Sequence, residues 1–266
     1  RAFPAPSTFS LAAAHLGWRV EDTACLGLHA APFERLLPVL RPGAQAIVLL
    51  RDGAAPAALA GWLAARGWGE SALWVMEALG GPRERIRPAA AAGFGLTDVQ
   101  APVAVALVAQ GGTARPTGPG LPDDAFHHDG QITKRPVRVL TLSALGPGPG
   151  ALLWDLGAGS GSVAVEWALA GGRTVAVERR ADRLANIRAN IAAFGLGESL
   201  RAVDADSLTA LADLPDPDAV FVGGGLTQAL ADALWGRIRP GVRLVANAVT
   251  LETESLLADL HARRER

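Results

Sequence analysis

Short apolar runs separated by segments of helical periodicity recur through the second half of the chain. The runs occupy Ala151–Leu156, Arg173–Glu178, Ser199–Asp204, Asp218–Gly225 and Val242–Val249. Runs of this length are typical of strands that are buried on both faces of a sheet. The clearest helical patterns between them extend over Pro136–Leu145 and Ala181–Phe194, the second stopped by Gly195. Strands that alternate with helices in this order predict a parallel, doubly wound sheet.

The first half of the chain shows a similar alternation of strand and helix patterns. The predicted strands lie near Thr23–Leu28 and at Ala44–Leu50, Ala72–Leu79 and Ala101–Ala109. The predicted helices cover Thr8–Leu16, a segment near Phe33–Leu40, and Pro56–Arg66. Ser7 suits an N-cap, and Pro56 suits the first turn of a helix, where a missing N–H costs nothing. These patterns predict a separate α/β lobe.

The two halves are joined by the stretch "GGTARPTGPGLPDD", Gly111–Asp124, which is dense in glycine and proline and has almost no apolar periodicity. Such a composition is typical of a linker. We therefore predict a first domain over residues 1–112, a linker over residues 113–122, and a second domain over residues 123–266.

Charge and cysteine content exclude several kinds of partner and site. The formal net charge is −1, with 10 basic and 8 acidic residues up to residue 116 and 15 and 18 after it. Neither half is therefore a basic arm of the kind that binds nucleic acid. The single cysteine, Cys25, rules out an internal disulfide and a multi-cysteine metal site, and we predict no bound metal. Without a membrane-spanning run or a signal peptide, we expect a cytoplasmic protein without membrane partners.

The stretch "DLGAGSGS" connects the first strand of the second half to a helical pattern that extends to about Ala170. Its glycines allow positive φ angles and bring free backbone N–H groups at a helix N-terminus close to a ligand. The dinucleotide fingerprint G-x-G-x-x-G would place its third glycine or alanine at position 162, where this chain has Ser162. The lysine followed by serine or threonine of a phosphate-binding P-loop is also missing from this turn.

Acidic residues stand at the ends of three successive predicted strands. Asp155 precedes the turn, where a carboxylate would repel a pyrophosphate and would suit a ligand with an ammonium and a sulfonium. Glu178 stands where an acid binds ribose hydroxyls, and Asp206 is placed to meet an adenine amino group. The predicted cofactor site consists of Asp155, Gly157, Ala158, Gly159, Gly161, Glu178 and Asp206. This combination resembles class I S-adenosylmethionine-dependent methyltransferases, with NAD binding as the alternative.

A polar segment, Leu121–Leu145, precedes the first strand of the second half and should lie over the carboxyl ends of the strands, where ligands of such sheets bind. Histidine and aspartate can act as acid–base groups, and lysine and arginine can pair with substrate carboxylates. The candidate catalytic residues are His127, His128, Asp129 and Lys134. The candidate substrate-binding residues are Thr133, Lys134, Arg138, Gly223, Gly224 and Asn247, the last three from turns at the same rim.

Four sequence motifs of the second half resemble the decarboxylating, carbon-15-methylating domain of precorrin-6Y C(5,15)-methyltransferases, a family of cobalamin (corrin) biosynthesis. These motifs are "PDDAF…DGQITKR…VR", "WDLGAGSGSVAVE", "AVFVGGG" and "ANAVTLETE". Three motifs of the first half resemble the carbon-5-methylating domain of the same family, which is a class III tetrapyrrole methylase. These motifs are "FPAPSTFSLAAAHLGW", "LGLHAAPFERL" and "EALGGPRERI". The resemblance implies the C-terminal lobe of a class III methylase followed by a Rossmann-like class I methyltransferase domain.

The resemblance also implies a reaction and its ligands. S-adenosyl-L-methionine would be the methyl donor and S-adenosyl-L-homocysteine the product. The tetrapyrrole precorrin-6B would be methylated at carbons 5 and 15 and would lose the carboxyl group of its ring C acetate, which gives precorrin-8. A homo-oligomer is expected, with a tetramer formed through the second domain as one candidate.

The chain departs from the family in three places. The N-terminal lobe of the carbon-5 domain is missing, as are the last strands of the second domain, and Pro136 stands where the family often has glutamate. Arg1 at the start and a single methionine, Met76, also suggest a fragment. Two other functions remain open: a class I methyltransferase acting on another substrate, and a non-catalytic module that binds NAD or another nucleotide.

Overall fold

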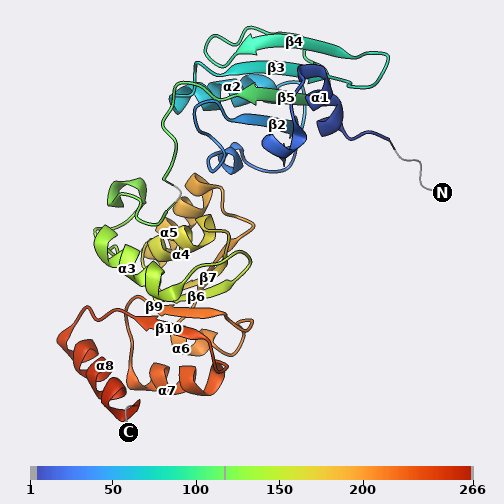
Figure 1. The fold of residues 1–266 in the computed structure, drawn as a ribbon. Helices are drawn as coiled ribbons and strands as arrows, with labels where there is room; N and C mark the ends of the chain where they lie inside the picture. Colours follow the sequence, from blue (N-terminus) through green and yellow to red (C-terminus); the bar gives the residue numbers. More distant parts are fainter. Residues whose placement is uncertain (1–4, 117, 265–266) are drawn as a thin grey trace. The chain divides into compact units, whose positions relative to one another are not determined.

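The computed structural model describes residues 5–116 and 118–264. The chain forms two compact units, unit 1 (Arg1–Arg115) and unit 2 (Pro116–Arg266), each with its own sheet (Figure 1). The boundary between the units lies inside the stretch predicted as a linker. Among the described residues, no helix has both the length and the apolar character needed to cross a membrane.

Unit 1 contains a mixed five-stranded sheet in the order β1-β2-β5-β3-β4. Its strands are β1 (Ala24–Gly27), β2 (Gln45–Leu50), β3 (Ala72–Glu77), β4 (Arg85–Ala90) and β5 (Val103–Val108). Its helices are α1 (Thr8–Leu16) and α2 (Ala55–Ala65), with two 3-10 turns, η1 (Val20–Asp22) and η2 (Phe33–Leu36). Successive residues of β2 point to opposite faces, so Val48 packs in the cluster that contains α2 and Ile47 packs against α1.

Helix α1 has the predicted bounds, and the Ser7 hydroxyl accepts a hydrogen bond from the Ser10 N–H as its N-cap. The helix predicted near Phe33–Leu40 is wrong, because only the short turn η2 forms there. Pro38 cannot donate a helical hydrogen bond and also disfavours helical backbone at the residue before it.

Strand β4 has no counterpart in the prediction. Its sequence contains Pro88, which argues against a central strand. The structure accommodates this proline because β4 is an edge strand that pairs only with β3, with Pro88 opposite Trp74.

Unit 2 contains a five-stranded sheet in the order β10-β9-β6-β7-β8, and all of its pairings are parallel. Its strands are β6 (Leu152–Leu156), β7 (Arg173–Glu178), β8 (Leu200–Asp204), β9 (Ala219–Val222) and β10 (Arg243–Ala246). Its helices are α3 (Arg135–Leu145), α4 (Ser162–Leu169), α5 (Ala181–Phe194), α6 (Ser207–Ala210), α7 (Gln228–Arg237) and α8 (Leu251–Arg264), and η3 (Asp123–Ala125) is a 3-10 turn. The predicted doubly wound fold is confirmed.

The two faces of this sheet are covered by different helices (Figure 1). Side chains of α3, α4 and α5 pack on one face, and those of α6, α7 and α8 pack on the other. The chain runs from β6 through β7 to β8 and then returns to β9 on the other side of β6. The carboxyl ends of β6 and β9 therefore form the switch point at which open α/β sheets bind ligands.

Candidate functional site

The glycine turn after β6 combines backbone conformations that glycine adopts readily with close packing at one of its three glycines. Gly157, Gly159 and Gly161 have φ angles of +66°, +60° and +71°, a region that residues with a side chain rarely adopt. A Cβ atom on Gly157 would lie 2.5 Å from the carbonyl oxygen of Gly224, in the turn after β9. A Cβ atom on Gly159 would meet nothing within 4 Å. Gly157 is thus required by packing, whereas Gly159 borders open space in which a ligand could lie.

Asp155, at the penultimate position of β6, is completely buried beneath this turn. Its Oδ2 accepts a hydrogen bond of 3.1 Å from the N–H of Ala164, and its Oδ1 has no hydrogen-bond partner among the described residues. Burial raises the pKa of Asp155 to about 7; the Ala164 N–H opposes this rise, and the charge of Glu178 adds to it. A buried oxygen without a partner is costly, so it identifies a place where a bound cation or donor would be favourable.

Glu178 ends β7 and is only 5% exposed. Its Oε2 accepts a hydrogen bond of 2.9 Å from the N–H of Gly159, and its Oε1 accepts one of 3.0 Å from the N–H of Arg180. The carboxylate is therefore tied to the central glycine of the turn. Each of its oxygens can still accept a second hydrogen bond, for instance from a hydroxyl group.

Asp206 follows β8 at the same rim and is half exposed. Its Oδ1 accepts a hydrogen bond of 2.9 Å from the N–H of Leu208, so Asp206 is the N-cap of α6. Its Oδ2 lies 3.9 Å from Nη1 of Arg179. Capping leaves acceptor capacity on Asp206 for a ligand group.

The segment that carries the predicted acid–base residues lies along α5. The N–H of His127 donates to Oδ1 of Asn190 at 2.7 Å, while Oδ2 of Asp129 accepts from Nε of Arg183 at 3.0 Å. The N–H of Gln131 and the Arg183 guanidinium hold the pKa of Asp129 below its usual value. Asp129 is therefore a carboxylate near neutral pH and a poor proton donor.

His128 is half buried, and its Nδ1 accepts a hydrogen bond of 3.0 Å from the N–H of Gly130. A neutral imidazole that accepts at Nδ1 carries its proton on Nε2. The imidazole of the neighbouring His127 is exposed, because the interactions of that residue with Asn190 use its backbone.

Arg138, predicted to bind substrate, has a different role. Its side chain is fully buried, and its Nε donates to Oε1 of Glu166 at 2.6 Å while its Nη1 donates to Oδ1 of Asp123 at 3.0 Å. It also donates to the carbonyl oxygens of Leu121 and Thr133. The prediction for Arg138 is therefore wrong, because its guanidinium is occupied in fastening residues 121–133 to α4.

Unlike Arg138, Lys134 and Thr133 are not fully buried. The Lys134 side chain is 62% exposed, and its Nζ lies 3.9 Å from Oδ2 of Asp123. Thr133 is half buried and uses its carbonyl oxygen as an acceptor for Arg138. Lys134 therefore keeps a mobile positive charge that can meet an anionic substrate.

The turns after β9 and β10 supply the remaining predicted contacts. Gly223 is packed against the ring of Phe221 and the carbonyl of Gly157, but a Cβ on Gly224 would meet nothing within 4 Å. Asn247 donates from Nδ2 to the hydroxyl of Thr141 on α3 at 3.1 Å. Its backbone N–H is bonded to β9, so Asn247 is held firmly at the rim.

Sequence reasoning missed two buried polar residues that hold this region together. Glu166 is a single acid in the otherwise apolar stretch "SVAVEWAL", and a lone charge on a buried helix is a signal for a buried ion pair. Asn190 on α5 carries no comparable signal, because the face of a helix that it occupies becomes clear only after α5 has packed.

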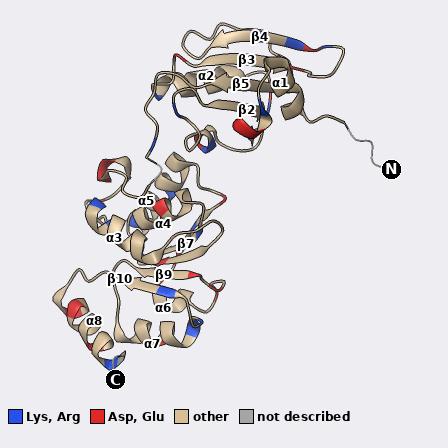
Figure 2. Cartoon of the chain, viewed as in Figure 1, with Lys and Arg blue, Asp and Glu red and all other residues tan. Residues whose placement is uncertain are grey.

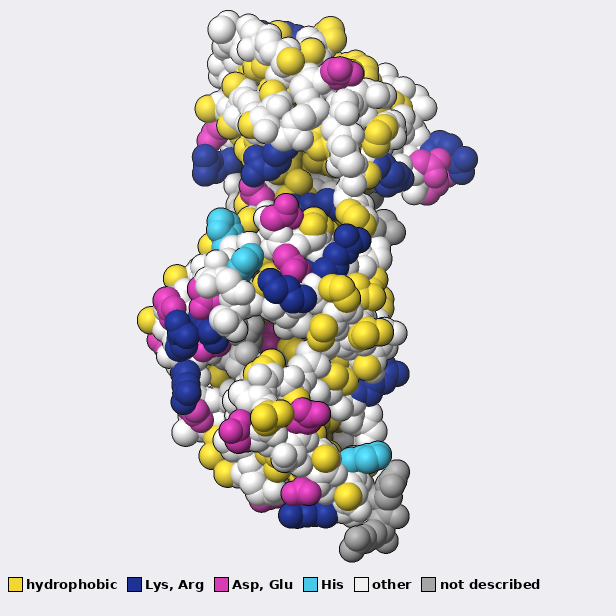
Figure 3. Space-filling model, turned by 90° about the vertical axis from the view of Figure 1, so that its left-hand side faces the viewer, with side chains coloured by type: hydrophobic (Ala, Val, Ile, Leu, Met, Phe, Trp, Pro, Cys, Tyr) yellow, Lys and Arg dark blue, Asp and Glu magenta, His cyan; other side chains and the backbone are white. Residues whose placement is uncertain are grey.

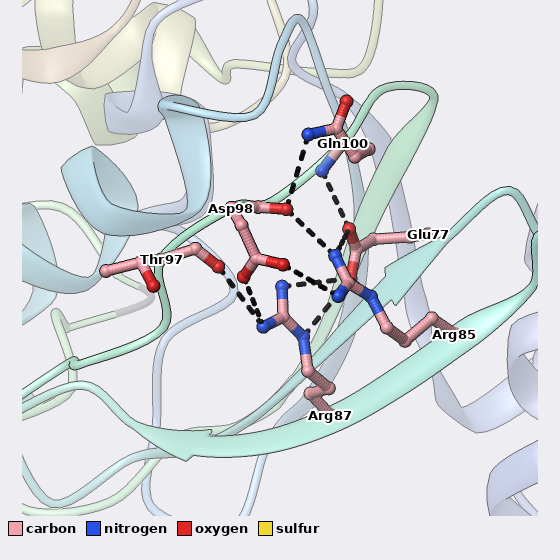
Figure 4. Close-up of polar contacts among 6 residues, drawn as sticks. All are labelled: Glu77, Arg85, Arg87, Thr97, Asp98 and Gln100. Atoms are coloured by element: carbon pink, nitrogen blue, oxygen red, sulfur yellow. Dashed lines mark hydrogen bonds and ion pairs between the residues drawn. The ribbon is translucent and has the colours of Figure 1, made fainter.

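Unit 1 contains a separate polar network around Glu77, which is 2% exposed at the end of β3 (Figure 4). Its carboxylate accepts from Arg85 at 2.7 and 2.9 Å, from Arg87 at 3.2 Å and from the N–H of Gln100 at 2.7 Å. Asp98 pairs with both arginines. Burial alone would raise the pKa of Glu77, but these partners hold it below its usual value. The network ties β3, β4 and the loop before β5 together.

Charged residues of both signs are scattered along both units (Figure 2), and the face in Figure 3 mixes their side chains as well. This pattern agrees with the net charge of −1. Within residues 5–116 and 118–264, no group of three or more His, Cys, Asp or Glu side chains is placed to hold a metal ion.

Comparison with known proteins relates both units to one enzyme group. Residues 124–265 match a family described as "Precorrin methyltransferase domain". A precorrin-6Y C(5,15)-methyltransferase (decarboxylating) from Sinorhizobium sp is 45% identical over 269 residues, which cover 99% of this chain and 65% of that relative. The chain thus spans slightly less than two thirds of the length of this relative.

Two further relatives match about half of the chain. A probable cobalt-precorrin-6B C(15)-methyltransferase (decarboxylating) from Pyrobaculum calidifontis is 37% identical over 142 residues, 51% of this chain and 72% of that relative. The crystal structure of the C-terminal domain of precorrin-6Y C5,15-methyltransferase from Rhodobacter capsulatus is 60% identical, with a TM-score of 0.55. It covers 56% of this chain and 81% of that domain.

Proposed function

Because the chain belongs to the precorrin methyltransferase family, we propose that unit 2 binds S-adenosylmethionine and methylates carbon 15 of a precorrin with loss of carbon dioxide. The observation that carries this proposal is the pair of buried carboxylates, Asp155 and Glu178, beneath a glycine turn that borders open space. The turn lies at the switch point of a parallel sheet, where such ligands bind.

The residues of the turn fit this donor. Asp155 offers a buried oxygen without a partner, which suits a ligand that carries an ammonium and a sulfonium. Glu178 can accept from the ribose hydroxyls and Asp206 from the adenine amino group. Gly159 would let a ligand approach the turn closely, because a Cβ there would meet nothing within 4 Å, and Ala158 is held in place by its N–H, which donates to the carbonyl of Val177. When bound, S-adenosylmethionine would supply an electrophilic methyl group, with S-adenosylhomocysteine as the product.

The acceptor is proposed to be precorrin-6B, a reduced tetrapyrrole with several carboxylates. Its electron-rich carbons are themselves nucleophiles, so the protein need only hold the reacting carbon in line, and positioning can supply most of the rate. Lys134 would pair with a substrate carboxylate, and Thr133 and Asn247 would add polar contacts. The open space beside Gly224, where a Cβ would meet nothing within 4 Å, would leave room for a flat macrocycle, and Gly223 would be needed for the packing of the same turn.

Decarboxylation of the ring C acetate breaks the bond between its methylene and carboxyl carbons. The electron pair passes into the conjugated macrocycle, carbon dioxide leaves, and the macrocycle takes up a proton. His127 and His128 are the groups that we propose to supply this proton, because the His127 residue is exposed, the His128 residue is only partly buried, and histidine is the side chain that most often acts as a general acid. Asp129 would orient the segment through Arg183 rather than donate a proton.

Methylation at carbon 5 is proposed for the whole protein rather than for unit 1 as it stands here. Unit 1 aligns with the Sinorhizobium relative, but the chain spans only 65% of that relative. The complete reaction, two methylations and one decarboxylation to precorrin-8, therefore needs the full-length protein. The expected homo-oligomer and cytoplasmic location also remain predictions.

The test is to incubate this chain with precorrin-6B and methyl-labelled S-adenosylmethionine and to follow the product by mass spectrometry. We expect gain of one methyl group and loss of one carbon dioxide. Methylation with all carboxylates retained would contradict the decarboxylation. Calorimetry with S-adenosylhomocysteine and with NAD is the companion measurement, and binding of NAD alone would support a nucleotide-binding module instead.

A further inference from the structure

We propose that Asn190 is a positioning residue that couples the glycine turn to residues 121–134, so that donor binding orders the segment that faces the acceptor. This inference rests on the proposed function, because it takes the glycine turn as the donor site. It goes further in assigning a role to a residue that touches neither ligand in the proposed site.

The carboxamide of Asn190 bridges two pieces of chain that are far apart in the sequence. Its Oδ1 accepts from the N–H of His127 at 2.7 Å, and its Nδ2 donates to the carbonyl of His127 at 3.0 Å. The same Nδ2 donates to the carbonyl of Ser160 at 2.9 Å. Ser160 lies between Gly159 and Gly161, so a single side chain holds the turn on one side and both backbone polar groups of His127 on the other.

The environment of Asn190 makes this bridge rigid. The residue is 0% exposed, and three of the four hydrogen bonds available to its amide are made. A buried amide whose partners move away loses bonds that water cannot replace. A displacement of Ser160 on ligand binding is therefore felt at His127.

Other contacts fasten the segment to helices but do not reach the turn through hydrogen bonds. Phe126 stacks on Phe194 with ring centroids 5.4 Å apart, and Asp129 pairs with Arg183 on α5. Arg138 pairs with Glu166 on α4. Among the residues that the structure describes, no other side chain hydrogen-bonds both the turn and residues 121–134. These contacts fix where the segment lies, and Asn190 links it to the state of the donor site.

Amide hydrogen exchange of the 266-residue chain, with and without saturating S-adenosylhomocysteine, tests this coupling. In the wild-type chain we expect slower exchange both in peptides over residues 157–161 and in peptides over residues 121–134. In Asn190→Asp, which keeps the acceptor but removes both donated bonds, protection of the turn should remain. Exchange over residues 121–134 with ligand bound should be about tenfold faster than in wild type.

Two further variants separate coupling from general damage. Asn190→Leu removes all three hydrogen bonds without burying a charge, so it tests the same loss if the aspartate variant does not fold. Asn186→Asp is the matched control, because Asn186 lies one turn earlier on α5, is only half buried, and makes no side-chain hydrogen bond within the part of the chain that the structure describes. Its exchange pattern should equal that of the wild type.

The outcomes are distinct. Ligand-dependent protection of residues 121–134 that survives in both Asn190 variants would overturn the coupling, as would a wild-type chain in which only the turn is protected. A wild-type chain that does not bind S-adenosylhomocysteine at all would overturn the proposed donor site, and the coupling with it. Loss of protection confined to residues 121–134 in the Asn190 variants would support the coupling.

Discussion

At the level of single residues, the most unusual group of the candidate site is the buried carboxyl group of Asp155, one oxygen of which has no hydrogen-bond partner among the described residues. Asp155 is removed from water, and only one of its oxygens is hydrogen-bonded. In the free protein this arrangement favours the protonated acid, whereas a cationic ligand favours the carboxylate. Protein stability and donor binding should therefore respond to pH in opposite directions at this residue.

The stability of unit 2 should fall as pH rises from about 4 to about 7, because Asp155 binds its proton more tightly in the folded chain than in the unfolded one. Above pH 7 this contribution should be constant. Asp155→Asn should remove this dependence, which amounts to at most about 4 kcal/mol. Urea denaturation of both proteins at several pH values measures it. Identical pH profiles would show that Asp155 does not titrate in this range.

Glu178→Ala should weaken binding of S-adenosylhomocysteine by about 10- to 100-fold, since it removes charge-assisted hydrogen bonds to the ribose. Calorimetry measures the affinity. Glu178→Gln keeps the size and one acceptor oxygen and should bind with an intermediate affinity. Asp182→Ala, an exposed acid paired with Arg180, is the control and should bind like the wild type. Unchanged affinity in Glu178→Ala would refute the ribose assignment.

At the level of elements, we expect different glycines of the turn after β6 to serve packing and ligand binding. Gly157→Ala forces a Cβ to within 2.5 Å of the Gly224 carbonyl, so it should lower the unfolding temperature of unit 2. Gly159→Ala meets no such contact, and its cost is the positive φ angle, about 1 kcal/mol. Its main effect should be on S-adenosylhomocysteine affinity, because the new methyl enters the open space.

Thermal unfolding and calorimetry of both glycine variants provide the comparison. Gly197→Ala, at a glycine with no neighbour within 4 Å and no positive φ angle, is the control for a glycine substitution in unit 2. Equal losses of affinity in Gly157→Ala and Gly159→Ala at equal stability would show that the two glycines do not have separate roles.

Regular elements were predicted well where local periodicity was strong and poorly where a proline interrupted it. The five parallel strands of unit 2 and helix α1 lie where their patterns place them. The segment after Phe33 was expected to be a helix, but Pro38 prevents one, and β4 was missed because Pro88 is tolerated only at a sheet edge. The edge position depends on which strands pair, and pairing is not a local property.

For the molecule as a whole, each unit has its own sheet and its own apolar clusters. We therefore expect two transitions in scanning calorimetry. Glu77 contributes stability to unit 1 above its usual pKa of about 4.3, and this contribution is lost as pH falls through its lowered folded-state pKa. Glu77→Ala should lower only one transition, by several degrees, because it leaves two partly buried arginines without this carboxylate.

The control for this measurement is Glu70→Ala, which replaces an exposed acid of the same unit. It should leave both transitions in place. A single transition in the wild type, or a shift of both transitions in Glu77→Ala, would contradict independent units.

The α/β class of both units and the position of the glycine turn followed from local patterns in the chain, because periodicity and turn chemistry act over a few residues. The family followed from the resemblance of short sequence stretches to those of known members. The roles of individual polar residues did not follow. Arg138 was predicted to be a free cation, but its guanidinium is paired with Glu166. Asn190 was not predicted to have a role, although it joins two segments that are distant in the sequence. What a polar side chain does depends on the group that folding places opposite it, and those partners lie 28 to 63 residues away in the sequence.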